Sequence, residues 1–275
     1  MGEKETDHSN QSRISRRSFL KTMPVLSVGA VMIAREVLNP PRKDPLEFEE
    51  IDAITKAELL EYSPLTVFHN VMNSSSRFGT ALATASSYMD VDVVEFDGDI
   101  FASHDPYREI PLIEKLLPFI ISGPFKPKFE DIAAIAADKG RALYLDLKNI
   151  NSKNFLRVRE ILEEYGLEES SLFNSKNWRL LQEIGELYGP DKVFFPIDTN
   201  SALERFIESE IPQGNISLAQ HLTTQENVDY LKRVGYRVIS FTVNSSAEAL
   251  DVLRMGCDGF VSENIDLLNV YAARL

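Results

Sequence analysis

The chain has 275 residues, of which 44% are hydrophobic and 26% charged, and its formal net charge is −13. This balance is typical of a globular protein with a sizeable core, and the length suffices for one large domain or two small ones. The acidic charge argues against nucleic-acid binding, which needs a basic face. The single cysteine, Cys257, excludes a disulfide within the chain, so the core and any bound metal must hold the fold.

The first 35 residues differ from the rest of the chain and are predicted to be a leader. Ser15-Arg-Arg-Ser-Phe-Leu-Lys21 matches the twin-arginine export signal, and residues 22–34 form a mildly apolar stretch. That stretch is too short to span a bilayer comfortably, since about 20 residues are needed. We therefore predict export by the twin-arginine route, with the leader either cleaved or kept as a membrane anchor. Residues 36–62, which begin Pro-rich and charged, are predicted to be a linker that ends in a short helix over residues 51–61.

Residues 63–275 alternate between β-branched or aromatic runs and amphipathic segments. Eight runs are predicted as strands: 65–71, 91–96, 142–147, 171–174, 192–197, 216–219, 237–243 and 259–262. A helix is predicted after each: 77–89, 129–139, 153–165, 178–187, 201–210, 225–234, 247–255 and 265–273. Eight such units are typical of an α/β fold of the closed kind, a (β/α)8 TIM barrel. A doubly wound open sheet is the alternative, but it usually has fewer strands and a Gly-rich first turn, which this chain lacks.

The interval between the second and third predicted strands is much longer than the others, which indicates a short insertion over about residues 107–128. The insertion contains four prolines and an apolar run at residues 116–123. Because barrels of this kind carry their chemistry at the carboxyl ends of the strands, the insertion is predicted to be a lid over the substrate. The alternative is a hydrophobic flap that only caps the barrel mouth.

The stretch from Val91 to Asp105 carries acids where a buried strand would ordinarily carry more Val or Ile. Side chains alternate between the two faces of a strand, so Glu95 and Asp97 point to the same side. Two carboxylates on an inward face repel each other unless a cation lies between them. With His104 a few residues on, the pattern predicts a divalent-metal site beside an acid/base group. The alternative is a solvated strand end followed by a surface histidine.

Three further residues stand at the ends of neighbouring predicted strands. His69 ends the first strand, whereas Asp146 and Lys148 end the third and share one of its faces. In a barrel these side chains would meet Glu95 and Asp97 around one pocket, although Asp146 and Lys148 alone could be an ordinary ion pair. Three carboxylates predict Mg²⁺ or Ca²⁺ as the cofactor, and zinc is disfavoured because acids outnumber histidines and only one cysteine exists.

In chain order these residues resemble the motifs of the glycerophosphodiester phosphodiesterase family, one of the phospholipase-C-like phosphodiesterase barrels. The matching segments are His69-Asn70, Glu95-Phe-Asp97, His104-Asp105, Asp146-Leu-Lys148, Phe241-Thr-Val-Asn244 and Gly256-Cys-Asp-Gly-Phe-Val-Ser262. The resemblance covers about residues 65–275. It implies one divalent cation bound by Glu95, Asp97 and Asp146. It also implies that His69 and His104 act as general base and general acid, and that Lys148 contacts the phosphate.

The chain departs from the family at two positions. Asn70 stands where the family usually has a phosphate-binding Arg, and Asp146 stands where it usually has Glu. With His69 and Asn73, this pattern is also similar to the phospholipase D toxins of spider venom and to menorin-like barrels. Loss of the Arg removes a bidentate phosphate clamp, which bears on the choice of substrate. We keep Asn70, with Lys148, as a predicted substrate-binding residue.

The sequence thus predicts an exported, metal-dependent phosphodiesterase that hydrolyses glycerophosphodiester-type or lysolipid-like substrates. A cation offsets the charge of the phosphate oxygens, and two imidazoles can divide the roles of proton acceptor and donor. Two alternatives stay open: a phospholipase D-like lyase that forms cyclic phosphates, and a non-catalytic barrel that binds phosphorylated ligands. The expected partners are a small-molecule or lipid phosphodiester and, through the leader, a membrane.

Overall fold

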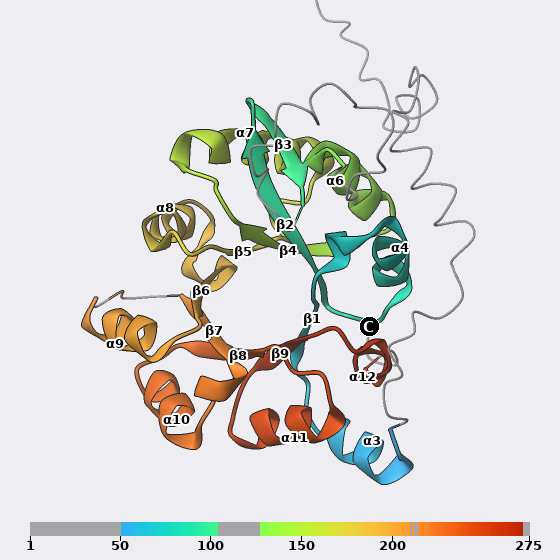
Figure 1. Cartoon of the computed structure of the whole chain (residues 1–275), viewed down its shortest axis with the longest axis vertical. Helices are drawn as coiled ribbons and strands as arrows, with labels where there is room; N and C mark the ends of the chain where they lie inside the picture. Colours follow the sequence, from blue (N-terminus) through green and yellow to red (C-terminus); the bar gives the residue numbers. More distant parts are fainter. Residues whose placement is uncertain (1–50, 104–126, 210, 212–213, 272–275) are drawn as a thin grey trace, which may run out of the picture.

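The computed structural model describes residues 51–103, 127–209, 211 and 214–271. Its centre is a barrel of eight parallel strands with helices around the outside (Figure 1). The barrel strands are β1 (Leu65–Phe68), β2 (Tyr88–Phe96), β4 (Ala142–Leu147), β5 (Leu172–Asn174), β6 (Val193–Ile197), β7 (Asn215–Ala219), β8 (Arg237–Phe241) and β9 (Gly259–Ser262). Strand β1 pairs with β2 on one side and with β9 on the other, so the sheet closes on itself. The predicted (β/α)8 TIM barrel is confirmed.

Several predicted segments lie outside the described residues. They are the leader, the first part of the linker up to residue 50, and residues 104–126, which include His104 and most of the insertion. The short helix expected at the end of the linker is present as α3 (Ala53–Leu59). Asp52 caps the helix by accepting hydrogen bonds from the N–H groups of Ile54 and Thr55, and Leu59 is fully buried in the core.

A helix follows each barrel strand, as predicted. These helices are α4 (Ser75–Ala83), α6 (Phe129–Asp138), α7 (Ser152–Tyr165), α8 (Trp178–Tyr188), α9 (Asn200–Glu208), α10 (Gln225–Arg233), α11 (Ser246–Arg254) and α12 (Ile265–Asn269). Most begin at a Ser, Thr or Asn whose side chain accepts a backbone N–H of the first turn: Ser74, Asn151, Asn177, Thr199, Thr224, Ser245 and Asn264. These caps fix where each strand-to-helix loop ends. In the described part of the chain, no helix is long and apolar enough to traverse a bilayer.

The largest difference from a predicted boundary lies between the first and second strands. The predicted helix 77–89 ends at Ala83, and β2 begins at Tyr88 rather than at residue 91. The N–H of Ser87 donates to Thr66 Oγ1 over 3.0 Å, and Val67 then pairs with Tyr88. The chain has therefore already joined the sheet where helical periodicity alone would continue the helix.

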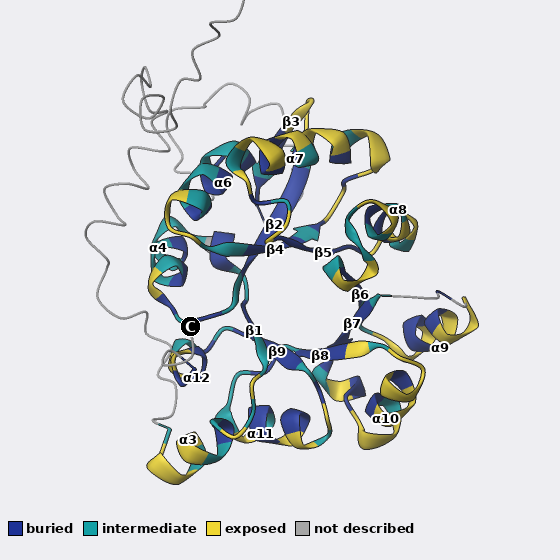
Figure 2. Cartoon of the chain, turned by 180° about the vertical axis from the view of Figure 1, so that it is seen from behind, coloured by how far each residue is buried: buried dark blue, intermediate teal, exposed yellow. Residues whose placement is uncertain are grey.

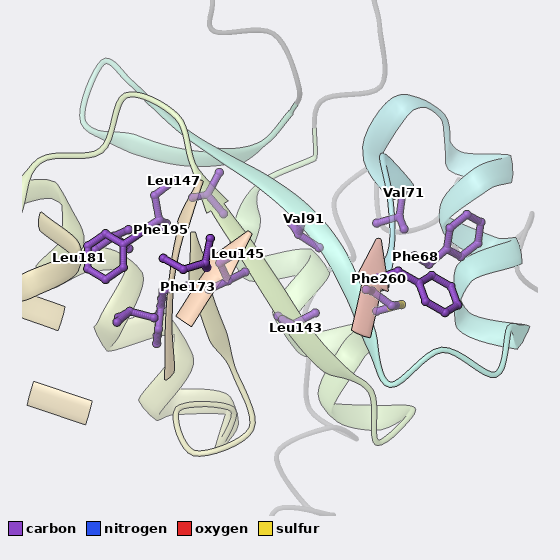
Figure 3. Packing of buried hydrophobic residues seen from close by; sticks show 14 of the residues in the cluster. Phe68, Val71, Val91, Leu143, Leu145, Leu147, Phe173, Leu181, Phe195 and Phe260 are labelled. Carbon is purple, nitrogen blue, oxygen red and sulfur yellow. The ribbon is translucent and has the colours of Figure 1, made fainter. Parts of the chain in front are cut away.

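The core has two layers, one on each face of the barrel wall. Between strands and helices lie outward side chains such as Val91, Leu143 and Leu145 (Figure 3). Inside the barrel lies a smaller cluster, which includes Val67 and Tyr144. The wall is almost entirely buried, whereas exposed residues lie mainly on the outer helices (Figure 2). Because strand side chains alternate, this division tells which residues of each strand face inward.

The closure between β1 and β9 depends on a glycine. Gly259 pairs with Leu65, and a Cβ atom at Gly259 would lie only 2.1 Å from the Leu65 carbonyl oxygen. No side chain fits at that distance without moving the backbone. The absence of a side chain at this position therefore lets the first and last strands approach.

Strand β2 continues past the barrel rim into a hairpin. Its last four residues pair antiparallel with β3 (Asp99–Ala102), and Asp97 and Gly98 form the two-residue turn. Both turn residues have positive φ, 52° and 84° respectively. Asp-Gly is a preferred sequence for such a turn. The hairpin stands at the edge of the barrel (Figure 1).

Candidate functional site

A cavity of about 290 Å³ opens at the carboxyl ends of the barrel strands. Its ionisable lining residues are His69, Asp90, Asp146, Lys148, Lys176 and Asp198. Its neutral polar lining residues are Tyr144, Asn174, Ser217 and Thr242. This end of a (β/α)8 barrel is where such folds carry their chemistry. The cavity is therefore the candidate functional site.

The structure brings three of the predicted site residues to this cavity: His69, Asp146 and Lys148. Strands β1, β2 and β4 are neighbours, which explains why residues so far apart in sequence meet. Asn70 follows His69 but is not a lining residue. Its backbone N–H donates to Asp90 Oδ2 over 3.1 Å, and its side chain binds Glu263.

The structure does not bring Glu95 and Asp97 to the cavity, which corrects their predicted placement. Asp92 is the β2 residue that pairs with Asp146, so Glu95 lies beyond the barrel rim. Glu95 is also an even number of residues from Val91 and Val93, whose side chains point outward, so the strand alternation turns Glu95 outward as well. The backbone of Glu95 is held by the Asn149 side chain, and its carboxylate accepts the N–H of Gly98 over 2.7 Å. Asp97 is exposed in the hairpin turn.

Asp90 lines the cavity and Asp92 contacts its lining residue Lys148, so these two acids stand where Glu95 and Asp97 were expected. They have the same spacing and face inward, and they are only 4% and 1% exposed. Asp92 Oδ1 lies 2.9 Å from Lys148 Nζ, whereas the buried Asp92 Oδ2 has no hydrogen-bond partner in the described part of the protein. Sequence reasoning missed this pair, although Asp90-Val-Asp92 shows the same acid-x-acid alternation five residues before Glu95-Phe-Asp97.

The acids of the cavity strongly influence one another. Burial, together with the neighbouring Asp92 charge, raises the pKa of Asp90 to about 7. Burial also raises the pKa of Asp146, and the adjacent Lys148 only partly offsets this. Burial would lower the pKa of Lys148, but Asp146 and Asp92 outweigh it and raise the pKa. Two of the three acids, Asp92 and Asp146, thus share the Lys148 ammonium group, and Asp90 lies beside them.

The donor set fits a hard divalent cation. Asp90, Asp92 and Asp146 offer carboxylate oxygens, which Mg²⁺ and Ca²⁺ prefer, and Asp92 Oδ2 is a buried acceptor without a partner. Within the described ranges, no three Asp, Glu, His or Cys side chains are already grouped as metal ligands are. Lys148 Nζ instead lies between Asp92 and Asp146 and contacts both.

His69 is held by a network that the sequence analysis did not include. Its Nδ1 lies 3.1 Å from Glu263 Oε1, and its Nε2 lies 3.9 Å from Asp90 Oδ2. Glu263 Oε2 is 3.2 Å from an Arg77 nitrogen, and Arg77 also donates to the His69 carbonyl oxygen. Burial would lower the pKa of His69, but the bond to Glu263 and the charge of Asp90 outweigh burial and raise it. Glu263 could have been predicted as a site residue because it is an acid directly after a strand. Arg77 lies within α4, and no sequence motif marked it as a site residue.

The cavity is also lined by neutral polar side chains. Tyr144 and Asn174 are 2% and 8% exposed. The Tyr144 hydroxyl and Asn174 Oδ1 make no hydrogen bond of good geometry with the described residues, although Ser217 lies close enough to Tyr144 to affect its pKa. Burial raises the Tyr144 pKa well above its ordinary value, so this phenol stays neutral. The Lys176–Asp198 ion pair, 2.8 Å long, stands at the rim.

Fold and site together define a class: a (β/α)8 barrel with an acid–histidine–lysine cluster at the carboxyl ends of its strands. Solved structures share this fold. A proposed glycerophosphoryl diester phosphodiesterase from Agrobacterium tumefaciens is 16% identical, with a TM-score of 0.63 over 78% of this chain and 97% of that one. An Oleispira antarctica phosphodiesterase, solved with the product sn-glycerol-3-phosphate, is 18% identical, with a TM-score of 0.58 over 78% and 99%.

A glycerophosphodiester phosphodiesterase from Parabacteroides distasonis is also similar, at 13% identity and a TM-score of 0.57 over 78% of this chain and all of that one. No protein-family model matches the sequence, and no curated protein matches it. At these identities the likeness establishes the fold that the chain shares with these phosphodiesterases. The chain spans nearly their whole length.

Proposed function

We propose that this protein is a cation-dependent phosphodiesterase of the glycerophosphodiester type. One observation carries the proposal: His69, three carboxylates and Lys148 converge at the mouth of a barrel whose fold is that of solved glycerophosphodiester phosphodiesterases. A phosphodiester resists hydrolysis because its anionic oxygens repel a nucleophile. A site of this kind combines hard oxygen ligands, an ammonium group and an imidazole, which together address that repulsion.

The proposed cation ligands are Asp90, Asp92 and Asp146. They replace the expected set of Glu95, Asp97 and Asp146, because only the first three face the barrel interior. A divalent cation bound there would place positive charge beside a non-bridging phosphate oxygen. The excess of acids over Lys148 and the unpartnered oxygen of Asp92 support this assignment.

The protein side chains have distinct proposed tasks. His69 Nε2 faces the acids of the cavity and would take up a proton from the attacking water or hydroxyl. His104, outside the described residues, is the proposed proton donor to the leaving alcohol. Lys148 is partly exposed at the cavity and would contact the phosphate. Each proton transfer by a positioned side chain is worth roughly 10²–10⁴ in rate.

The neutral polar lining residues of the cavity favour a substrate whose alcohol carries free hydroxyl groups. Tyr144, Asn174 and Ser217 offer hydroxyl and amide groups, and two of their buried polar atoms lack partners. A hydrogen-bonding alcohol would satisfy those atoms, whereas an acyl chain would leave them unpaired. Glycerophosphodiesters are therefore favoured over lysolipids within the proposed substrate class.

The deciding experiment is product analysis by phosphorus NMR. The full-length protein is incubated with glycerophosphocholine or lysophosphatidylcholine, with Mg²⁺ or Ca²⁺ and with a chelator in parallel. We expect a glycerol phosphate product from glycerophosphocholine, its loss on chelation, and a lower rate with the lysolipid. A cyclic phosphate product would indicate the lyase instead. Absence of any product, with a melting temperature that the cation raises, would indicate a binding protein and contradict the proposal.

A further inference from the structure

His69 is held on the side away from the cavity by a carboxylate. Glu263, the first residue after β9, places Oε1 3.1 Å from His69 Nδ1. The pairing of Phe68 with Ser262 puts the ends of β1 and β9 side by side, which explains this contact between residues 194 apart in sequence. The Glu263 N–H donates to Asn244 Oδ1 over 2.9 Å. The backbone at Glu263 is thus held by the pairing of β1 with β9 and by the hydrogen bond to Asn244.

The Glu263 carboxylate is itself anchored by two other groups. Arg77 contacts Glu263 Oε2 at 3.2 Å and donates to the His69 carbonyl oxygen at the same distance. The guanidinium carbon of Arg77 lies 5.3 Å from the centre of the Phe68 ring, which packs beneath it. Asn70 Nδ2 donates to Glu263 Oε1 over 2.8 Å. The four side chains of His69, Asn70, Arg77 and Glu263 form a closed cluster, here called the His69 cradle.

The donors of the cradle fix which nitrogen of His69 carries the proton. The bonds from His69, Asn70 and Arg77 lower the pKa of Glu263 to about 2 despite partial burial, so the carboxylate is ionised at neutral pH and can only accept hydrogen bonds. Asn70 Nδ2 lies 3.1 Å from His69 Nδ1 as well, but it is closer to Glu263 Oε1, at 2.8 Å, and donates there. An unprotonated Nδ1 would face the carboxylate lone pairs of Glu263 at 3.1 Å, so His69 Nδ1 is the donor to Glu263. In a neutral imidazole Nε2 is then unprotonated, and Nε2 is the nitrogen on the side of Asp90 and the cavity.

We propose that Glu263 is a positioning residue for His69, holding Nδ1–H so that Nε2 faces the cavity as a proton acceptor. Arg77 and Asn70 act with it by fixing the carboxylate. Asn70, predicted from sequence to bind substrate, belongs to this cradle. This inference rests on the proposed function for its kinetic test, whereas its spectroscopic test is independent of activity.

The test compares Glu263→Ala, Glu263→Gln and Glu263→Asp in the full-length protein. We expect Glu263→Ala to lower kcat for glycerophosphocholine by about 10- to 100-fold, the usual effect of losing a partner that orients a functional histidine, with KM changed less than threefold. Glu263→Asp keeps the carboxylate and should recover most of the rate, whereas Glu263→Gln should not. The matched control is Glu204→Gln, on the exposed face of α9, which should leave kcat unchanged.

The second readout is nitrogen NMR of the histidine side chains, which number four in the chain. His69 is assigned by the signal that disappears in His69→Asn. At a pH where the imidazole is neutral, we expect the protonated nitrogen to be Nδ1 in the wild type and in Glu263→Asp, and this preference to be lost in Glu263→Ala. An unchanged tautomer in Glu263→Ala, or equal losses of kcat in Glu263→Ala and Glu263→Asp, would overturn the proposal. If the wild type hydrolyses no diester, the proposed function is wrong. The role of Glu263 is then tested by the His69 tautomer alone.

Discussion

Asp92 is the residue whose surroundings say most about the site. It is almost completely buried, and one of its oxygens contacts Lys148 while the other has no partner among the residues described. A buried acceptor that lacks a partner costs roughly 1–3 kcal/mol, and more when it is charged. A cation at that oxygen would remove the cost. Asp92 should therefore matter more for cation binding than any acid on the hairpin.

This argument gives a direct comparison of Asp92→Asn with Glu95→Gln. We expect Asp92→Asn to lose the rise in melting temperature that Mg²⁺ or Ca²⁺ causes in the wild type, and its hydrolysis of diesters. Glu95→Gln should keep both. A cation at 100 times its Kd stabilises a protein by about 2.7 kcal/mol, which is easily measured by thermal unfolding. The reverse pattern, with Glu95→Gln impaired and Asp92→Asn normal, would restore Glu95 as a ligand.

Asp92 and Glu95 together show what the sequence could and could not predict. The pattern acid-x-acid occurs twice, at Asp90-x-Asp92 within β2 and at Glu95-x-Asp97 where β2 runs into the hairpin turn. Alternation tells which residues share a face, but the face that turns inward depends on register, and a shift of an odd number of residues exchanges the faces. The Asp97-Gly98 turn signal favoured a hairpin and would have placed Glu95 outside the barrel. His69, Asp146 and Lys148 were predictable because each stands at the end of a short strand with clear boundaries.

At the scale of elements, the helix starts were predicted more closely than the helix ends, and Ser, Thr or Asn caps mark the first turns of all the helices that follow barrel strands except α6. The start of β2 was less predictable. Its first residues follow a helix without a break in apolar periodicity, and only the pairing with β1 ends the helical run. The Glu263–His69 contact was beyond local patterns altogether, since it exists only after β9 closes onto β1.

That closure can be tested at one residue. Gly259→Ala should destabilise the protein by about 1–3 kcal/mol or more, because a Cβ atom there meets the Leu65 carbonyl oxygen at 2.1 Å and the backbone must move. Gly185→Ala is the matched control. Gly185 lies inside α8, where an added Cβ has no neighbour closer than 3.5 Å. It should stabilise by roughly 0.5–1 kcal/mol. Chemical unfolding measures both, and equal stability of the two variants would contradict this account of the closure.

At the scale of the whole molecule, the cysteine content is compatible with folding before the proposed export. The described barrel has one extensive core, and its cysteine, Cys257, is buried, with its thiol pKa raised to about 12 by burial. Such a thiol is protonated and unreactive at neutral pH. The barrel therefore needs no oxidising compartment to complete its fold. This agrees with the proposed twin-arginine route, which carries folded proteins.

The export proposal depends on two leader residues, Arg16 and Arg17. Replacing both with Lys should block export and leave the folded protein in the cytoplasm, because the signal is read by its paired guanidinium groups. Arg13→Lys, outside the pair, is the control and should export normally. Immunoblotting of cytoplasmic and extracytoplasmic fractions measures the outcome. Undiminished export of the double variant would rule out this route.

The position of Lys148 between Asp92 and Asp146 affects both folding and cation binding. The Lys148 ammonium group reduces the repulsion between Asp92 and Asp146, so we expect the barrel to fold without a bound cation. A cation bound by Asp92 and Asp146, as proposed, would have to displace that ammonium group from both carboxylates. A divalent ion would recover more of the lost ion-pair energy than sodium or potassium, so we expect Lys148 to favour divalent ions at this site.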